Sequence, residues 1–166
     1  MRGIKASINR EKRKKAANMG IIIDTNVFFK APIILSLAER ERINVYITKE
    51  IYDEVKYKGK DFLIPKNIKI LPEQDIEPFF SDKIYHELGR ADKSILNACI
   101  TFPDIDVILS YDKDIIFFNW NLKLLEQFNK KVSIMKPEEF LRKYKLRGRR
   151  RRVEKWVKIK KNQRGD

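Results

Sequence analysis

The chain has 166 residues, and 43% of them are hydrophobic, so it is long enough to bury one core without stabilising crosslinks. Its single cysteine excludes a disulfide framework and indicates a reducing compartment. No run approaches about 20 apolar residues and no apolar region follows the basic N-terminus, so we expect neither a spanning helix nor a secretory signal. These features predict a soluble, cytoplasmic protein with one folded domain and no membrane partner.

The net charge of +14 is unevenly distributed along the chain. Residues 1–18 carry a net +6 and residues 141–166 a net +11, whereas residues 19–140 carry −3. A mildly acidic body between basic ends predicts a polyanionic partner, most often a nucleic acid. The alternative is that both ends are solvated tails with no dedicated partner. We therefore divide the chain into a basic arm, a folded domain and a basic tail, at 1–18, 19–145 and 146–166.

Strand-like and helix-like segments alternate along the folded domain. The expected strands are residues 20–24, 43–47, 68–71, 106–110 and 131–135. The expected helices are residues 26–40, 49–57, 79–88, 91–102, 114–128 and 138–144. Pro32 is expected early in the first helix, where proline is tolerated, and Thr48 is expected as the N-cap of the second. The alternation predicts an α/β fold with a mostly parallel sheet and helices on both faces.

The composition changes abruptly from about Leu146. A basic run cannot bury a core face, so it predicts a flexible or conditionally ordered arm. Together with the stacking surface of Trp156, the arginines of this run offer phosphate contacts to RNA. Residues 153–159 fit either a helix or a strand. The arginines are Arg147, Arg149, Arg150, Arg151 and Arg152.

Four acidic residues occupy comparable positions relative to the expected strands. Asp24 and Asp112 follow the first and fourth strands, Glu54 lies on the helix after the second strand, and Asp92 lies in the first turn of a helix. Because the carboxyl ends of parallel strands share one edge, we expect the four to converge there. Clustered carboxylates repel one another unless a cation neutralises them, and hard oxygen ligands suit Mg²⁺ or Mn²⁺. The implied chemistry is metal-assisted hydrolysis of a phosphodiester.

Each of these acids also has a local structural interpretation. Asp24 can cap a helix, Asp92 can complement a helix dipole, and Glu54 can be a solvated helix residue. Asp112 and its neighbour Asp114 can form a turn or a cap. The only histidine and the only cysteine, His86 and Cys99, are too few for a zinc site and are expected to be structural.

The segments that carry these acids resemble the PIN domain, the PilT N-terminus-like nuclease family. The matching stretches are 21–26 (IIIDTN), Glu54, 89–98 (GRADKSILNA) and 108–114 (ILSYDKD), and the resemblance covers about residues 19–140. The family implies a three-layer α/β/α sandwich with a central parallel sheet. It also implies an acidic site that binds Mg²⁺ or Mn²⁺ and cleaves RNA.

Site residues follow from this resemblance position by position. The four main acids of the family match Asp24, Glu54, Asp92 and Asp112. A variable fifth acidic position matches Asp114. Small polar positions that help to hold the ligands or the phosphate match Asn26 and Ser110.

The leading expectation is a metal-dependent endoribonuclease that processes RNA, such as ribosomal or transfer RNA, which its basic ends retain. Within the same class, the alternative is the toxin ribonuclease of a toxin–antitoxin pair, whose partner would be an antitoxin protein. Related domains often dimerise, so a homodimer is also an expected state. From a different class, the alternative is a non-catalytic RNA-binding module. A receiver-like phosphoacceptor fits less well, because the lysine that it needs has no clear candidate.

Overall fold

A computed structural model of the protein describes residues 2–74, 88–112 and 130–164, with Lys123, Leu125, Glu126 and Phe128 between the last two ranges. Its elements are, in chain order, α1 (Arg2–Ala17), β1 (Gly20–Ile23), α2 (Thr25–Lys30), α3 (Pro32–Glu39), β2 (Asn44–Thr48), α4 (Lys49–Tyr57), the 3-10 turn η1 (Asp61–Leu63), β3 (Lys69–Leu71), α6 (Arg90–Thr101), β4 (Ile105–Leu109), β5 (Ser133–Met135), α8 (Pro137–Lys143) and α9 (Arg150–Arg164).

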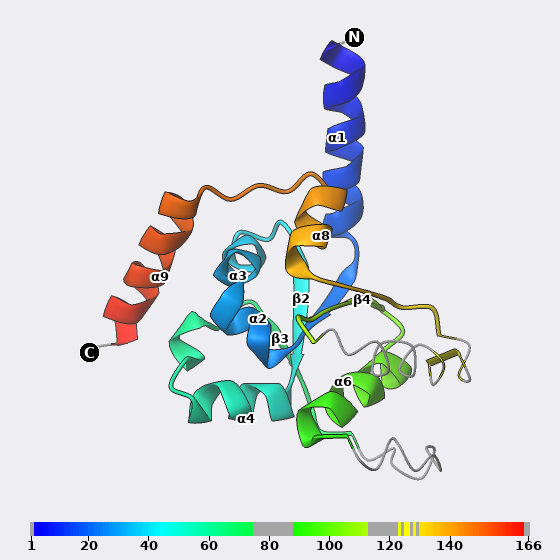
Figure 1. Ribbon diagram of the computed structural model, residues 1–166, viewed down its shortest axis with the longest axis vertical. Coiled ribbons are helices and arrows are strands. Elements are labelled where there is room, and N and C mark those ends of the chain that lie inside the picture. The colour runs from blue at the N-terminus through cyan, green and yellow to red at the C-terminus, as the bar shows by residue number, and fades with distance from the viewer. Residues whose placement is uncertain are drawn as a thin grey trace.

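The five strands form one parallel sheet in the order β3-β2-β1-β4-β5. Figure 1 shows α2 and α3 on one side of the strands and α6 on the other, so the predicted three-layer α/β/α sandwich is confirmed. Since β1 pairs with both β2 and β4, the chain winds outward from β1 in two directions. Sheets of this kind bind ligands beyond the carboxyl ends of the strands at such a switch point.

The central strand is the apolar run Ile21, Ile22 and Ile23, each with no exposed surface. Continuous β-branched residues are typical of a parallel strand that is covered on both faces. Gly20 begins the strand at a close approach, because a Cβ atom there would lie 1.9 Å from the carbonyl oxygen of Asp104. The register then pairs Ile23 with the last residue of β4, so both strands end at the same level.

The single helix expected over residues 26–40 is wrong, because two helices, α2 and α3, occupy this range. Pro32 is the first residue of α3 rather than an interior residue. Proline lacks an N–H and disfavours helical geometry in the residue before it. Accordingly Ala31 has φ −140° and ψ 62°, outside the helical region, and separates the two helices.

Of the flexible or conditionally ordered arm expected from Leu146, Arg150–Arg164 is ordered as the helix α9, which decides between the helix and the strand left open for residues 153–159. Figure 1 shows α9 beside α3, and it also contacts η1. The indole N–H of Trp156 donates to Glu39, which also pairs with Lys160, and Trp156 is only 9% exposed. Val153 and Val157 lie on the same helical face as Trp156, as the helical alternative for this segment predicts.

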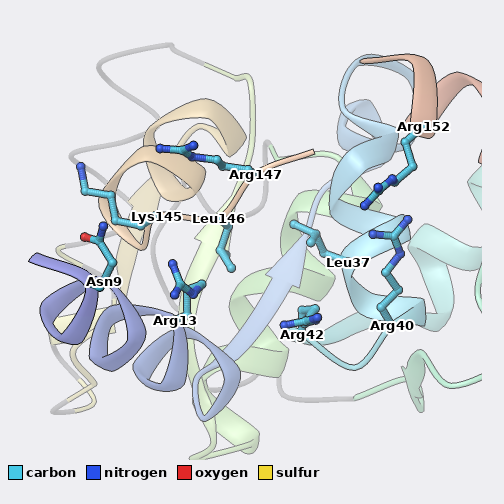
Figure 2. Close-up of a pocket in the computed structure, with 10 residues that line it drawn as sticks. Asn9, Arg13, Leu37, Arg40, Arg42, Lys145, Leu146, Arg147 and Arg152 are labelled. Carbon is cyan, nitrogen blue, oxygen red and sulfur yellow. The ribbon is translucent and has the colours of Figure 1, made fainter. Parts of the chain in front are cut away.

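The N-terminal arm is a helix as well. Figure 1 shows α1 projecting from the body, with α8 beside its lower half. Side chains of α1, of the end of α3 and of the segment after α8 surround a groove (Figure 2). Ala16 is the buried residue of α1, so the helix is attached at its C-terminal end and is otherwise largely exposed.

Several expectations fall on parts of the chain that the structure leaves undescribed. These are most of the expected helices 79–88 and 114–128, together with Asp114 and His86. The remaining expected strands and helices are present within a few residues of the expected bounds, and Thr48 caps α4 by accepting from the Ile51 N–H. No helix among the described residues is long and apolar enough to cross a bilayer.

Replacing the anchoring tryptophan should release α9. We expect Trp156→Ala to lower the free energy of unfolding by about 3 kcal/mol, because a large, nearly buried side chain is lost. Urea denaturation measures the loss, and limited trypsin digestion should cleave α9 faster than in wild type. The matched control is Ile159→Ala on the same helix, whose side chain is 46% exposed and which should behave like wild type. An unchanged rate of α9 cleavage in Trp156→Ala would contradict the docking of this helix.

Candidate active site

Asp24 lies directly after β1, at the carboxyl edge of the sheet, and its side chain is buried. Its backbone N–H donates to the carbonyl of Leu109 at 3.1 Å, which extends the pairing of β1 with β4. Its Oδ1 accepts from the Thr25 N–H at 2.7 Å, and its Oδ2 accepts from the Ser110 hydroxyl at 3.0 Å. Asp24 therefore caps α2, as its local interpretation predicts, and both carboxylate oxygens are held in one orientation.

Ser110 connects the ends of two strands. Its buried hydroxyl donates to Asp24 and accepts from the backbone N–H of Asp112 at 3.0 Å. Its own N–H donates to the carbonyl of Met135 at 3.2 Å, so the backbone continues the ladder between β4 and β5. One serine thus orients Asp24 and also the loop that carries Asp112.

The carboxyl groups of Asp24 and Asp92 both have raised pKa values. Burial is the main cause for Asp92, and the charges of Asp24, Asp112 and Glu54 add to it, which raises its pKa to about 6. Burial likewise raises the pKa of Asp24 against the opposing effect of its two hydrogen-bond donors, with added repulsion from Glu54 and Asp112. The four acids that the sequence singled out therefore share one electrostatic environment, although they come from four separate segments.

Glu54 is the member of this group that lies on α4. It is partly exposed and pairs with Lys58 at 3.3 Å, one helical turn away. Of the three acids on this helix, Glu54 is the one that contributes to the raised pKa values of both Asp24 and Asp92. Asp53 instead pairs with Lys49 at 3.2 Å. The structure therefore favours Glu54 over its neighbours as the α4 acid that faces the cluster.

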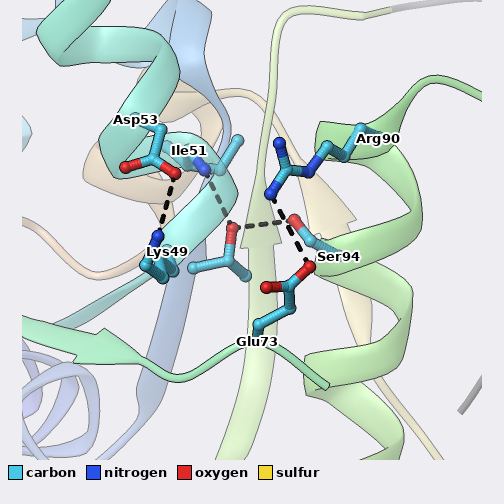
Figure 3. A network of polar contacts seen from close by, with 7 residues as sticks. Lys49, Ile51, Asp53, Glu73, Arg90 and Ser94 are labelled. Carbon is cyan, nitrogen blue, oxygen red and sulfur yellow. Dashed lines mark hydrogen bonds and ion pairs between the residues drawn. The ribbon is translucent and has the colours of Figure 1, made fainter. Parts of the chain in front are cut away.

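A buried hydroxyl network joins the start of α4 to the start of α6, and Figure 3 shows it beside the exposed ion pair of Glu73 with Arg90. The Thr48 hydroxyl accepts from the Ile51 N–H at 3.1 Å and lies 2.7 Å from the Ser94 hydroxyl. Ser94 donates its one proton to the carbonyl of Ala91 at 2.6 Å, so Thr48 must donate to Ser94.

This network fixes the relative position of two helices that each carry one acid of the cluster. Glu54 lies one and a half turns after Thr48, and Asp92 lies two residues before Ser94. Sequence reasoning identified Thr48 only as a helix cap and did not single out Ser94. The signal in the sequence was the position of Ser94, which lies one turn into α6 and two residues after the expected ligand Asp92.

A small hollow at this edge of the sheet is lined by Asp24, Asp92 and Ser110 together with the apolar side chains of Ile95, Leu96, Ile108 and Ile134. Apolar walls around two carboxylates explain why burial dominates both pKa shifts. Among the described residues, neither Asp24 nor Asp92 has a lysine or arginine within ion-pair distance. Their mutual repulsion is therefore not offset by a cation from that part of the chain.

No group of three or more His, Cys, Asp or Glu side chains in the described ranges is arranged so that it could hold a metal ion. Asp114, the expected fifth ligand, lies outside these ranges. The donors nevertheless fit Mg²⁺ or Mn²⁺ in kind, because both ions prefer carboxylate oxygens. A cation beside Asp24 and Asp92 would also relieve the repulsion that raises their pKa values.

The other expected site residues lie elsewhere. Asn26 is exposed in the first turn of α2. The arginines of the basic run are exposed, in the loop before α9 and in its first turn: Arg147, Arg149, Arg150, Arg151 and Arg152. Trp156 packs against the body, so its buried position does not fit the expected stacking on a base. Cys99 is fully buried, which raises its thiol pKa to about 12 and fits a structural role.

No protein-family model matches the chain, and no curated protein matches it.

Removing the charge of Asp92 should stabilise the protein without metal. Because its folded pKa of about 6 lies above the ordinary value of 3.8, ionised Asp92 destabilises the fold above pH 6. That cost disappears as the pH falls through 6 towards about 4. In EDTA at about pH 8, we expect Asp92→Asn to gain on the order of 1 kcal/mol, which raises Tm by about 2–4 °C.

Thermal melts at about pH 8 and at about pH 4 measure this effect, and the gain in Tm should vanish at about pH 4. Asp53→Asn is the matched control, because Asp53 is exposed and already paired with Lys49, so its Tm should stay near wild type at both pH values. A lower Tm for Asp92→Asn at the higher pH would show that repulsion within the cluster does not govern the stability of this edge.

Proposed function

We propose that the protein is a metal-dependent endoribonuclease of the PIN-domain type, which hydrolyses phosphodiester bonds in RNA. One observation carries the proposal: Asp24 and Asp92 lie at the switch point of a parallel sheet with pKa values raised mainly by burial, and Glu54 and Asp112 from two further segments add repulsion to both. Buried like charges cost stability, and perturbed pKa values are typical of functional sites. A site built to receive a cation explains this cost.

The residues that would hold Mg²⁺ or Mn²⁺ are Asp24, Glu54, Asp92 and Asp112. When bound, such an ion polarises a phosphoryl oxygen and lowers the pKa of a bound water. The chain itself supplies orientation: Ser110 and the Thr25 N–H hold both oxygens of Asp24 in place before substrate arrives. The Thr48–Ser94 bond holds the two helices that carry Glu54 and Asp92. Preorganised ligands of this kind avoid reorganisation during the reaction.

The basic ends support a role in processing ribosomal or transfer RNA in the cytoplasm. Residues 1–18 and 141–166 carry a net +6 and +11, and both regions contain helices beyond the sheet. Toxins that resemble this domain are compact, so these additions favour processing over a toxin with an antitoxin partner.

A second candidate function is a non-catalytic RNA-binding module. The observation that favours it is the net charge of +6 and +11 on residues 1–18 and 141–166, which can supply affinity for RNA without any cleavage. In that case the cluster has a structural role and the basic surfaces supply the affinity. This candidate predicts that the wild-type protein binds RNA in the presence of Mn²⁺ and leaves it intact.

Cleavage of total RNA with Mn²⁺ or Mg²⁺, followed by mapping of the new ends, tests the nuclease. We expect EDTA to abolish cleavage and Asp24→Asn or Asp92→Asn to lower the rate by at least about 100-fold, because each removes a charge that would hold the ion. Glu54→Gln should also be slower. Its matched control is Asp53→Asn on the same helix, which should keep the wild-type rate. Cleavage that survives both EDTA and Asp24→Asn would refute the proposal.

A further inference from the structure

A groove of about 460 Å³ lies at the opposite end of the sheet from the acids, and Figure 2 shows the side chains that surround it. Its walls come from α1, from the end of α3 and the turn after it, from the segment that joins α8 to α9, and from the first turn of α9. Six of its lining residues are basic: Arg13, Arg40, Arg42, Lys145, Arg147 and Arg152. None of the described residues that line it is acidic.

The cations of this groove form no ion pair with the described part of the chain, although the charge of Glu39 interacts with that of Arg40. None of the six cations has a carboxylate within ion-pair distance there, and all but Arg13 are exposed. The closest acidic side chain to Arg40 along α3, Glu39, is already bonded to Trp156 and Lys160 of α9. Several like charges around one groove repel one another, so the arrangement favours an anionic occupant.

The side-chain types indicate what that anion is. Five of the six cations are arginines, whose planar guanidinium groups bind phosphate through two parallel hydrogen bonds. The lining residues that the structure describes include no aromatic side chain, so they offer contacts to a phosphate backbone rather than to bases. Binding there would hold a strand without reading its sequence.

The groove also continues along α1, which favours an extended anion over a compact one. An adjoining groove of about 280 Å³ shares Arg13 and Arg42 with the first and adds Arg10 and Lys14. Glu41 is the one acid that lines it. Together the two grooves form a track of cations, and a polymer with regularly spaced phosphates fits such a track.

The track is separated from the acidic cluster by the length of the central strand. The turn after α3 leads into the start of β2, so the groove lies at the amino edge of the parallel sheet, whereas Asp24 lies at the carboxyl edge. At a rise of about 3.3 Å per residue, β1 alone separates the two edges by at least about 13 Å. Stacked nucleotides cover that span in roughly four steps or more.

We infer that this groove binds the phosphodiester backbone of RNA at a point remote from the acidic cluster, so that the substrate is an RNA long enough to reach both edges of the sheet. The choice of RNA rests on the proposed function, whereas the phosphate chemistry rests on the groove alone. The basic run contributes through two members, Arg147 and Arg152, and not as a unit, because Arg149 and Arg151 do not line the groove.

The test measures binding by fluorescence anisotropy with a labelled single-stranded RNA of about 20 nucleotides, in EDTA so that no cleavage occurs. The variant Arg40→Gln/Arg42→Gln/Arg147→Gln should bind at least about tenfold more weakly, and the slope of log Kd against log salt should fall by about 2. The matched control removes three exposed charges outside the groove and outside the basic ends, in Lys56→Gln/Lys66→Gln/Lys131→Gln. The Kd of this control for RNA should stay within about threefold of wild type. Charges that contact no phosphate contribute little to binding.

Two results would overturn the inference. One is an equal loss of affinity in both triple variants, which would show that net charge and not the groove retains RNA. The other is wild-type binding to phosphatidylserine vesicles that RNA does not displace, which would assign the groove to a membrane surface. Unchanged melting temperatures of both variants establish that they fold. Since binding is measured without metal, a protein that cuts no RNA would refute the proposed nuclease and leave this result standing.

Discussion

The pair of hydrogen bonds that Ser110 makes at the end of β4 is the constraint on which the acidic edge depends. One hydroxyl donates to the carboxylate after β1 and accepts from the loop that carries Asp112, so the two strands end in a fixed relation. This relation requires that β1 and β4 be neighbours, which holds only because the chain reverses its winding direction at β1. The topology thus creates the edge, and a single serine orders it.

Local sequence patterns were sufficient to predict most of the sheet. The run Ile21–Ile23 has only one plausible environment, a central strand covered on both faces, and the residue after it must then lie at the carboxyl edge. The position of Asp24 at the carboxyl edge was predicted in this way. The sequence also contained a signal for the break at Ala31, because Pro32 disfavours helical geometry in the residue before it. A sequence does not show, however, whether a proline is the first residue of a helix or lies within the first turn of a longer one.

Other features depend on contacts between distant segments, and no local pattern encodes them. Arg13 and Arg40 are 27 positions apart and Lys145 follows Arg40 by 105 positions, so the three meet only in the folded chain. The stretch Glu39 to Arg42 alternates in sign and carries no net charge, although Glu39 bonds to α9 whereas Arg40 and Arg42 line the groove. Ser94 became significant only when α6 was seen against α4. Pairings of this kind require the three-dimensional arrangement.

The docking of α9 through Glu39 affects how the basic groove and the acidic edge respond to denaturant. Terminal elements open locally at a lower free energy than the core, and α9 is held mainly by Trp156, its bond partner and a few contacts with η1. Mild denaturant would therefore detach one wall of the basic groove while β1 and β4 stay paired. Retention of long polyanions and integrity of the acidic edge are thus separable properties of one small domain, each with its own melting behaviour.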